Sequence, residues 1–185
     1  MRIILLSCGK WRIFADMDKM TKEQRHRCMA AIRSNNTRPE MLVRRYLFSR
    51  GFRYRLNHKR LPGHPDIVMR KYRTVIFVNG CFWHGHKECE NFRPPKTNTA
   101  FWQAKIERNI QRDKQEQLSL AKMGWHCITI WECQLKPSNR EATLASLAYT
   151  LNHIYLQDHA TRYTLPDANS GSMIAAEQDI QEDDT

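Results

Sequence analysis

The chain has 185 residues, of which 41% are hydrophobic, and it carries a formal net charge of +11. The length predicts one domain with terminal extensions, and no window approaches the roughly 18 apolar residues of a membrane span. All 30 Lys and Arg residues, but only 13 of the 19 acids, lie in positions 1–162, which gives this part a charge of +17. A folded body this basic is expected to bind a polyanion, with nucleic acid as the leading candidate and a ribosomal or membrane-surface role as the alternative.

The six cysteines do not indicate a disulfide framework, because the chain is long, basic and lacks a signal peptide. The first apolar run, residues 3–6, is too short for a secretory signal. We therefore expect a cytoplasmic protein with reduced thiols. Three cysteines are isolated in the sequence and are interpreted as packing residues: Cys8, Cys28 and Cys127.

The sequence divides into three parts. Residues 1–19 are interpreted as an N-terminal extension, which is non-native or disordered if the true start is a later methionine and is otherwise a short extra strand. The folded domain is predicted to span residues 20–160. Residues 161–185 are acidic, contain Gly and Ser and lack periodicity, so they are predicted to be a disordered tail.

Two helices are predicted at the start of the domain. Thr21 and Gln24 fit a capping box, and the helix that they begin is expected to end near Arg33. Pro39 suits the first turn of a second helix, and Gly51 suits its C-terminal cap.

Strands and helices then alternate. Residues 52–56 alternate apolar and basic side chains, as in a half-buried strand, and residues 75–78 form an apolar run typical of a central strand. The predicted elements in chain order are strand 52–56, strands 66–70 and 73–79 joined by a tight hairpin at Lys71-Tyr72, a loop at 80–99, helix 100–123, strand 125–132 and helix 140–156. This order predicts an α/β layered fold with a central mixed sheet flanked by helices, as in restriction-type nucleases.

The loop after the central strand has the composition of a metal site. Cys81, His86 and Cys89 can converge from one loop, and thiolates and imidazoles are the preferred ligands of zinc. A closed structural site needs a fourth ligand, which could be Cys133 after the next strand or His84, although Gly85 would let the backbone aim His84 away. The alternative is that the cysteines are small buried apolar residues.

Asp66 follows Pro65 at the start of a predicted strand, where a carboxylate can bind magnesium. Pro-Asp is also common in ordinary turns. Restriction-type nucleases usually add Glu-x-Lys on the next strand, but this chain has Phe77-Val78-Asn79 there. Asp66 alone therefore does not predict a nuclease.

The aromatic residues Phe82, Trp83 and Trp102 lie in polar surroundings, with Arg93, Lys96, Lys105 and Arg108 near them in the sequence. Aromatic side chains in such places can wedge between DNA bases while the basic groups bind phosphates. The alternative is that these aromatics belong to the core.

Four segments closely resemble the very-short-patch repair endonucleases, and the similarity covers about residues 20–156. The segments are Leu61-Pro62-Gly63-His64-Pro65-Asp66, residues 75–86, Phe101-Trp102-Gln103-Ala104-Lys105-Ile106 and Ile130-Trp131-Glu132-Cys133. The resemblance implies a restriction-endonuclease-like fold with a zinc-pinned loop. It also implies a magnesium-dependent enzyme that nicks DNA 5′ to the thymine of T:G mismatches, which arise when 5-methylcytosine is deaminated.

The resemblance also implies roles for single residues. In the active site, Asp66 and the backbone carbonyl of Val78 would bind magnesium, His84 would act on the attacking water, Glu40 would support the site and Asp113 would orient His84. The implied zinc ligands are Cys81, His86, Cys89 and Cys133, and the implied intercalating residues are Phe82, Trp83 and Trp102. Glu40 and Asp113 have an alternative as solvated helix faces, and Asn79 departs from members that carry a second active-site histidine.

The expected partner is double-stranded DNA with a T:G mismatch, bound by a monomer at the bacterial nucleoid. Mismatch-repair proteins and a cognate cytosine-5 methyltransferase are candidate partners in the same repair. Two other functions remain as alternatives: a zinc-stabilised DNA-binding module without catalysis, and a restriction endonuclease that cuts matched duplex.

Overall fold

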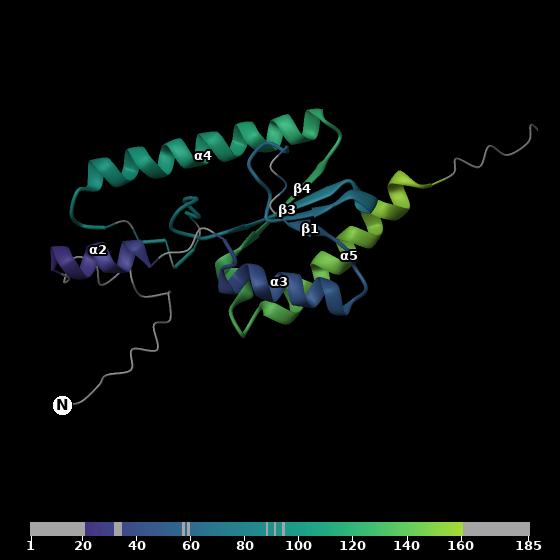
Figure 1. Cartoon of the computed structure of the whole chain (residues 1–185), viewed down its shortest axis with the longest axis horizontal. Coiled ribbons are helices and arrows are strands. Elements are labelled where there is room, and N and C mark those ends of the chain that lie inside the picture. The colour runs from purple at the N-terminus through teal and green to yellow at the C-terminus, as the bar shows by residue number, and fades with distance from the viewer. Residues whose placement is uncertain are drawn as a thin grey trace, which may run out of the picture.

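The computed structural model describes residues 21–31, 35–56, 58, 60–87, 89–90, 92–93 and 95–160 (Figure 1). The expected extension at 1–19, the expected tail at 161–185 and Cys8 lie outside these residues. Within the described part of the chain, none of the helices combines the length and apolarity that a membrane crossing requires.

The centre of the fold is a four-stranded mixed sheet with the order β1-β2-β3-β4. β1 (Arg55–Leu56) pairs antiparallel with β2 (Ile67–Met69), and β2 pairs antiparallel with β3 (Thr74–Asn79). β3 pairs in parallel with β4 (His126–Trp131). The predicted mixed sheet is confirmed, and Val75 and Ile76 of β3 are fully buried, as expected for a central strand.

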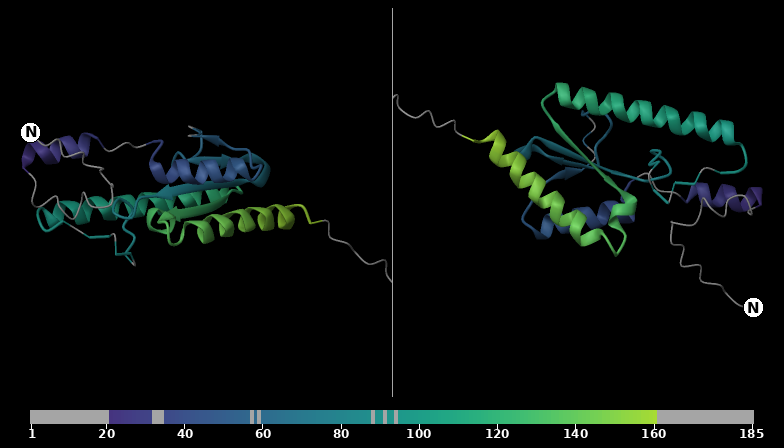
Figure 2. Two further views of the ribbon diagram at one scale, coloured as in Figure 1. Left: turned by 90° about the horizontal axis from the view of Figure 1, so that it is seen from below. Right: turned by 180° about the vertical axis from the view of Figure 1, so that it is seen from behind.

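Helices cover both faces of the sheet. α3 (Arg38–Ser49) and α5 (Arg140–Asp158) lie on one face, and α4 (Thr99–Lys122) lies on the other (Figures 1 and 2). The side chains of β2 alternate between these layers: Ile67 and Met69 pack with α3 and α5, whereas Val68 packs with Leu120 of α4. The predicted flanking helices are therefore confirmed.

The helix ends follow from local sequence. The predicted capping box of α2 (Lys22–Ala30) is present, with the Gln24 N–H donating to Thr21 Oγ1 and the Thr21 N–H donating to Gln24 Oε1. α3 has a second capping box, formed by Thr37 and Glu40, which the sequence analysis missed. Gly51 and Gly124, which follow α3 and α4, have φ angles of +84° and +76°, as glycine allows after a helix end.

Two connections differ from the sequence prediction. The strand predicted at 52–56 is reduced to Arg55–Leu56, because Phe52 turns into the core beside α3 and α5. The tight hairpin at Lys71-Tyr72 is instead a 3₁₀ helix, Arg70–Tyr72, between β2 and β3. This longer turn places the Tyr72 ring 5.4 Å from the rings of both Phe52 and Tyr155, so packing determines the connection.

Candidate active site and metal centre

Sheet topology brings the candidate residues to one end of the fold. β3 and β4 are parallel with Asn79 opposite Trp131, so the loop after β3 and the residues after β4 leave the sheet side by side. β2 runs the other way, so Asp66, just before its first residue, lies at this same end. Cys133 follows β4 in a 3₁₀ helix, Glu132–Leu135.

The loop after β3, called the Cys/His loop here, and the residues that follow β4 contribute side chains to a compact cluster. The ligand atoms of four residues all lie within 4.8 Å of one another: Cys81, His86, Cys89 and Cys133. Cys133 Sγ lies 3.4 Å from His86 Nδ1. The His86 ring stacks on Trp131 with centroids 4.2 Å apart and an interplanar angle of 5°, which fixes its orientation. Two thiols from the loop, one from beyond β4 and an imidazole can surround a single metal ion.

The chemistry of these thiols also fits a metal ion. Burial raises the pKa of the Cys81 thiol well above its usual range, and burial likewise raises the pKa of Cys133. Without a cation the two thiols therefore remain protonated, whereas a bound metal ion favours their thiolate forms. His84 is not a member of this cluster, and Cys133 takes the fourth place instead.

Asp66 is held in a partly buried position beside β3. Its Oδ2 accepts a hydrogen bond of 2.8 Å from the Val78 N–H. Burial raises the pKa of the Asp66 carboxyl to about 6 from its usual 3.8; the Val78 hydrogen bond opposes this shift and the charge of Glu40 adds to it. A carboxylate in such surroundings gains most from a nearby cation, which is what a metal ligand requires.

Glu40 is 2% exposed and is not a solvated helix face. Its Oε2 accepts hydrogen bonds from the Asn36 N–H and from Arg44 Nη2, both at 2.9 Å. Its Oε1 accepts from the N–H and the hydroxyl of Thr37, at 3.3 and 2.7 Å. Four donors occupy the carboxylate, so Glu40 can support the site through its charge and through the start of α3.

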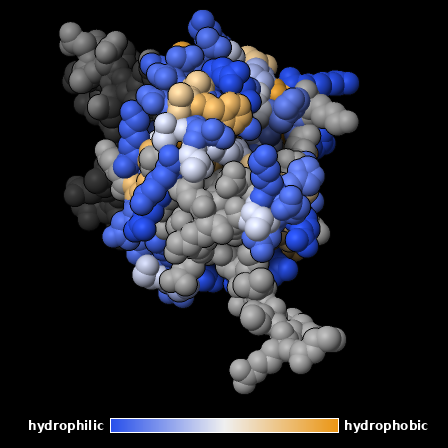
Figure 3. All heavy atoms as spheres, turned by 90° about the vertical axis from the view of Figure 1, so that its left-hand side faces the viewer, coloured by the Kyte–Doolittle hydropathy of each residue, from blue (hydrophilic) through white to orange (hydrophobic). Residues whose placement is uncertain are grey.

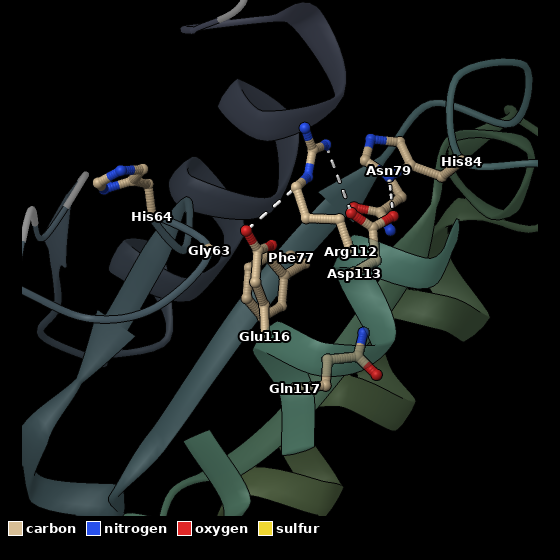
Figure 4. A pocket seen from close by; sticks show the side chains of 9 residues that line it. All are labelled: Gly63, His64, Phe77, Asn79, His84, Arg112, Asp113, Glu116 and Gln117. Carbon is tan, nitrogen blue, oxygen red and sulfur yellow. Dashed lines mark hydrogen bonds and ion pairs between the residues drawn. The ribbon is translucent and has the colours of Figure 1, made fainter. Parts of the chain in front are cut away.

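His84 and Asp113 meet in the space between the loop and α4 (Figure 4). His84 Nδ1 is hydrogen-bonded to Asp113 Oδ2, and both side chains are half-buried. Gly85 makes this placement possible, because its φ is +63° and a Cβ there would lie 2.6 Å from Ile110 of α4. Asp113 is therefore a partner of His84 and not a solvated helix face.

A cavity of about 290 Å³ opens beside this pair (Figure 4). Its lining residues are Gly63, His64, Phe77, Asn79, His84, Arg112, Asp113, Glu116 and Gln117. Sequence analysis selected only His84 and Asp113 of these as site residues, and it missed the titratable side chains of His64, Arg112 and Glu116. His64 could have been found from its place two residues before Asp66, and the other two from their i, i+4 spacing on the polar helix.

The three aromatic residues form one cluster. The rings of Phe82, Trp83 and Trp102 lie with centroids 5.3 to 6.0 Å apart, and Lys105 Nζ lies 5.4 Å from Trp83 and 5.6 Å from Trp102. Phe82 is only 4% exposed, whereas both tryptophans are half-buried. Phe101, 56% exposed, extends the cluster and was missed. Figure 3 shows hydrophobic residues set among largely hydrophilic ones on the face where α4 begins.

The raised pKa of Asp66 predicts a pH-dependent stability in the absence of added magnesium. The folded state binds the Asp66 proton more tightly than the unfolded state does. The contribution of Asp66 to the free energy of unfolding is therefore fully present below about pH 4 and is lost as the pH rises to about 6. Asp66→Asn cannot ionise and should be more stable above pH 6, by about 1–3 kcal/mol. Urea unfolding from pH 4 to 8 measures this, with exposed Glu107→Gln as control. The same pH dependence in Asp66→Asn and the wild type would contradict the burial of this charge.

A protein family and several known proteins are similar to this chain. The family described as DNA mismatch endonuclease Vsr matches residues 17–91. The type II nicking enzyme V.NmeAIP of Neisseria meningitidis is 50% identical over 119 residues, covering 64% of this chain and 84% of the relative. The type II nicking enzyme V.XorIIP of Xanthomonas oryzae is 47% identical over 118 residues, covering 64% and 86%. The DNA mismatch endonuclease Vsr of Escherichia coli is 40% identical over 119 residues, covering 64% and 76%. The chain therefore belongs to the Vsr family of endonucleases, which are DNA-cleaving hydrolases.

Proposed function

We propose that this protein is a magnesium-dependent, zinc-stabilised endonuclease that nicks DNA 5′ to the thymine of T:G mismatches. These mismatches arise from deamination of 5-methylcytosine and are corrected by very-short-patch repair. The observation that carries the proposal is the meeting of the Asp66 carboxylate and the His84–Asp113 pair at one end of the sheet, in a chain similar to a relative named as a mismatch endonuclease.

In this proposal Asp66, with the backbone carbonyl of Val78, holds magnesium. The ion would stabilise the charge that develops on the scissile phosphate. The contribution of the protein is to keep the Asp66 carboxylate in place, through the Val78 N–H, and partly removed from water. The negative charge of Glu40 near Asp66, which Arg44 partly balances, favours binding of a cation by the ionised Asp66.

His84 is the proposed general base. When Asp113 Oδ2 accepts a hydrogen bond from His84 Nδ1–H, the Nε2 lone pair of His84 is left to take a proton from the attacking water. This assignment of the tautomer follows from the hydrogen bond to a carboxylate. Asn79 lines the same cavity but cannot act as a base. The proposed mechanism therefore uses His84 alone as the base.

The aromatic cluster is the proposed reader of the mismatch. The half-buried rings of Trp83 and Trp102 could stack on bases where a mismatched duplex opens, and Lys105 beside them could bind a phosphate. Phe82 is the best-covered ring, so its insertion would require the cluster to open on DNA. The protein would act as a monomer on the bacterial nucleoid, alongside mismatch-repair proteins and a cognate cytosine-5 methyltransferase.

A second candidate, nicking of matched duplex at a recognition sequence, is suggested by the relatives named type II nicking enzymes. End-labelled duplexes that differ only in one T:G or T:A pair, placed in varied flanking sequences, separate the two functions. With magnesium, the proposal expects one nick 5′ to the mismatched thymine and little cleavage of the matched duplex. Equal nicking of both duplexes would support the second candidate and refute mismatch recognition.

The metal cluster is proposed to hold one structural zinc ion, because four protein ligands leave no position for water. Cys133→Ser should therefore lower zinc content and thermal stability together. The matched control is Cys127→Ser, a half-buried cysteine of β4 outside the cluster, which should keep its zinc. Unchanged zinc stoichiometry in Cys133→Ser, measured by metal analysis, would exclude Cys133 as a ligand.

Replacement of Trp83 tests the aromatic wedge. Trp83→Ala should weaken binding to T:G duplex far more than to matched duplex, because stacking of about 1–3 kcal/mol per base is gained only where the helix opens. The matched control is Trp125→Ala, whose side chain packs in the core beside α4. Its loss should cost about 3–5 kcal/mol of stability and weaken binding to both duplexes alike. If Trp83→Ala behaves like the control, the wedge role is wrong.

A further inference from the structure

The inner face of α4 contacts both loops that carry the proposed active-site residues. Asp113, Glu116 and Leu120 are spaced three and four residues apart, so they lie on one side of the helix. Asp113 is hydrogen-bonded to His84 of the Cys/His loop. Leu120 packs with Leu61, which begins the segment that leads to Asp66. Glu116 lies between these two anchors.

Glu116 fills the space above the backbone of Gly63. A Cβ at Gly63 would lie 2.8 Å from Glu116 Oε2 and 3.2 Å from both Cβ and Cδ of Glu116. Gly63 has a φ of +73°, and the next residue, His64, has a φ of +45°. Two successive residues in the left-handed region make a sharp bend that needs support from its surroundings. The Glu116 side chain provides a contact at this bend, three residues before Asp66.

Arg112 links this contact to the His84 pair. Its Nη2 lies 3.6 Å from Asp113 Oδ1 and its Nε lies 3.8 Å from Glu116 Oε1 (Figure 4). The Arg112 side chain is 57% exposed, so each ion pair contributes little to stability. Arg112 therefore lies between two carboxylates that face two different loops.

We infer that Glu116 is a positioning residue for DNA cleavage, which holds the 61–65 segment against α4 and thereby sets the place of Asp66. The inference rests on the proposed role of Asp66. Glu116 is not a member of the four-residue Cys/His cluster. The largest charge effects on the pKa of Asp66 come from Glu40, Arg44 and His84, whereas the observed link of Glu116 to the 61–65 segment is its contact with Gly63. Burial raises the pKa of Glu116, as expected for a carboxyl packed against backbone.

A role by contact predicts that the shape of the Glu116 side chain holds the 61–65 segment. Glu116→Ala removes the atoms that cover Gly63, whereas Glu116→Gln keeps their shape. Glu107→Ala, an exposed position on the same helix, is the matched control. Two measurements are needed on each protein: amide hydrogen exchange, and the kcat for nicking of T:G duplex with magnesium.

Glu116→Ala should speed exchange of the amides of residues 61–66 about tenfold or more, while those of β3 stay protected. It should also lower kcat by about 10- to 100-fold through misplacement of Asp66. Glu107→Ala should behave like the wild type in both measurements, and Glu116→Gln should keep the wild-type exchange of residues 61–66. Unchanged exchange at 61–66 in Glu116→Ala would overturn the inference, and so would exchange in Glu116→Gln as fast as in Glu116→Ala. If the wild type does not nick the duplex, the proposed function fails, and the exchange result still decides the role of Glu116 at the loop.

Discussion

The parallel pairing of β3 with β4 is the constraint on which both candidate sites depend. The register pairs Thr74 with His126 at one end and Asn79 with Trp131 at the other. This pairing places the Cys/His loop beside the 3₁₀ helix that carries Cys133. A ligand set separated by more than forty residues in sequence thus becomes a cluster within 4.8 Å. The antiparallel β2 then brings Asp66 to the same end, where the Val78 N–H of β3 binds its carboxylate.

The proposed active site places acidic groups at one end of a protein that is basic as a whole. Asp66 is a partly buried carboxylate with Glu40 nearby, in a protein whose net charge is +11. Such an arrangement costs folding stability when no cation is present, and it is typical of sites where binding compensates the cost. A basic surface attracts the phosphate backbone, and the acidic site within it suits a metal ion that would meet one phosphate.

Sequence analysis could predict most of the elements and part of the site. The capping box at Thr21, the central strand and the Cys81/His86/Cys89 loop follow from local patterns that the structure repeats. The choice between Cys133 and His84 as fourth member depends on strand pairing, so spacing alone left it open. The i, i+4 spacing of Arg112 and Glu116 is visible in the sequence, but the periodicity of a polar helix does not reveal that this side faces the 61–65 segment. Phe82 was expected in a polar loop, and its burial results from packing between Trp83 and Trp102.

Cleavage and binding by Asp66→Ala test the central claim most directly. Asp66 is proposed to hold the catalytic metal, and its carboxylate accepts a hydrogen bond from the Val78 N–H, whereas the proposed DNA contacts are made by other side chains. The account predicts that the purified variant binds T:G duplex with nearly the affinity of the wild type but does not nick it at any magnesium concentration. Substantial magnesium-dependent nicking by Asp66→Ala would contradict the account.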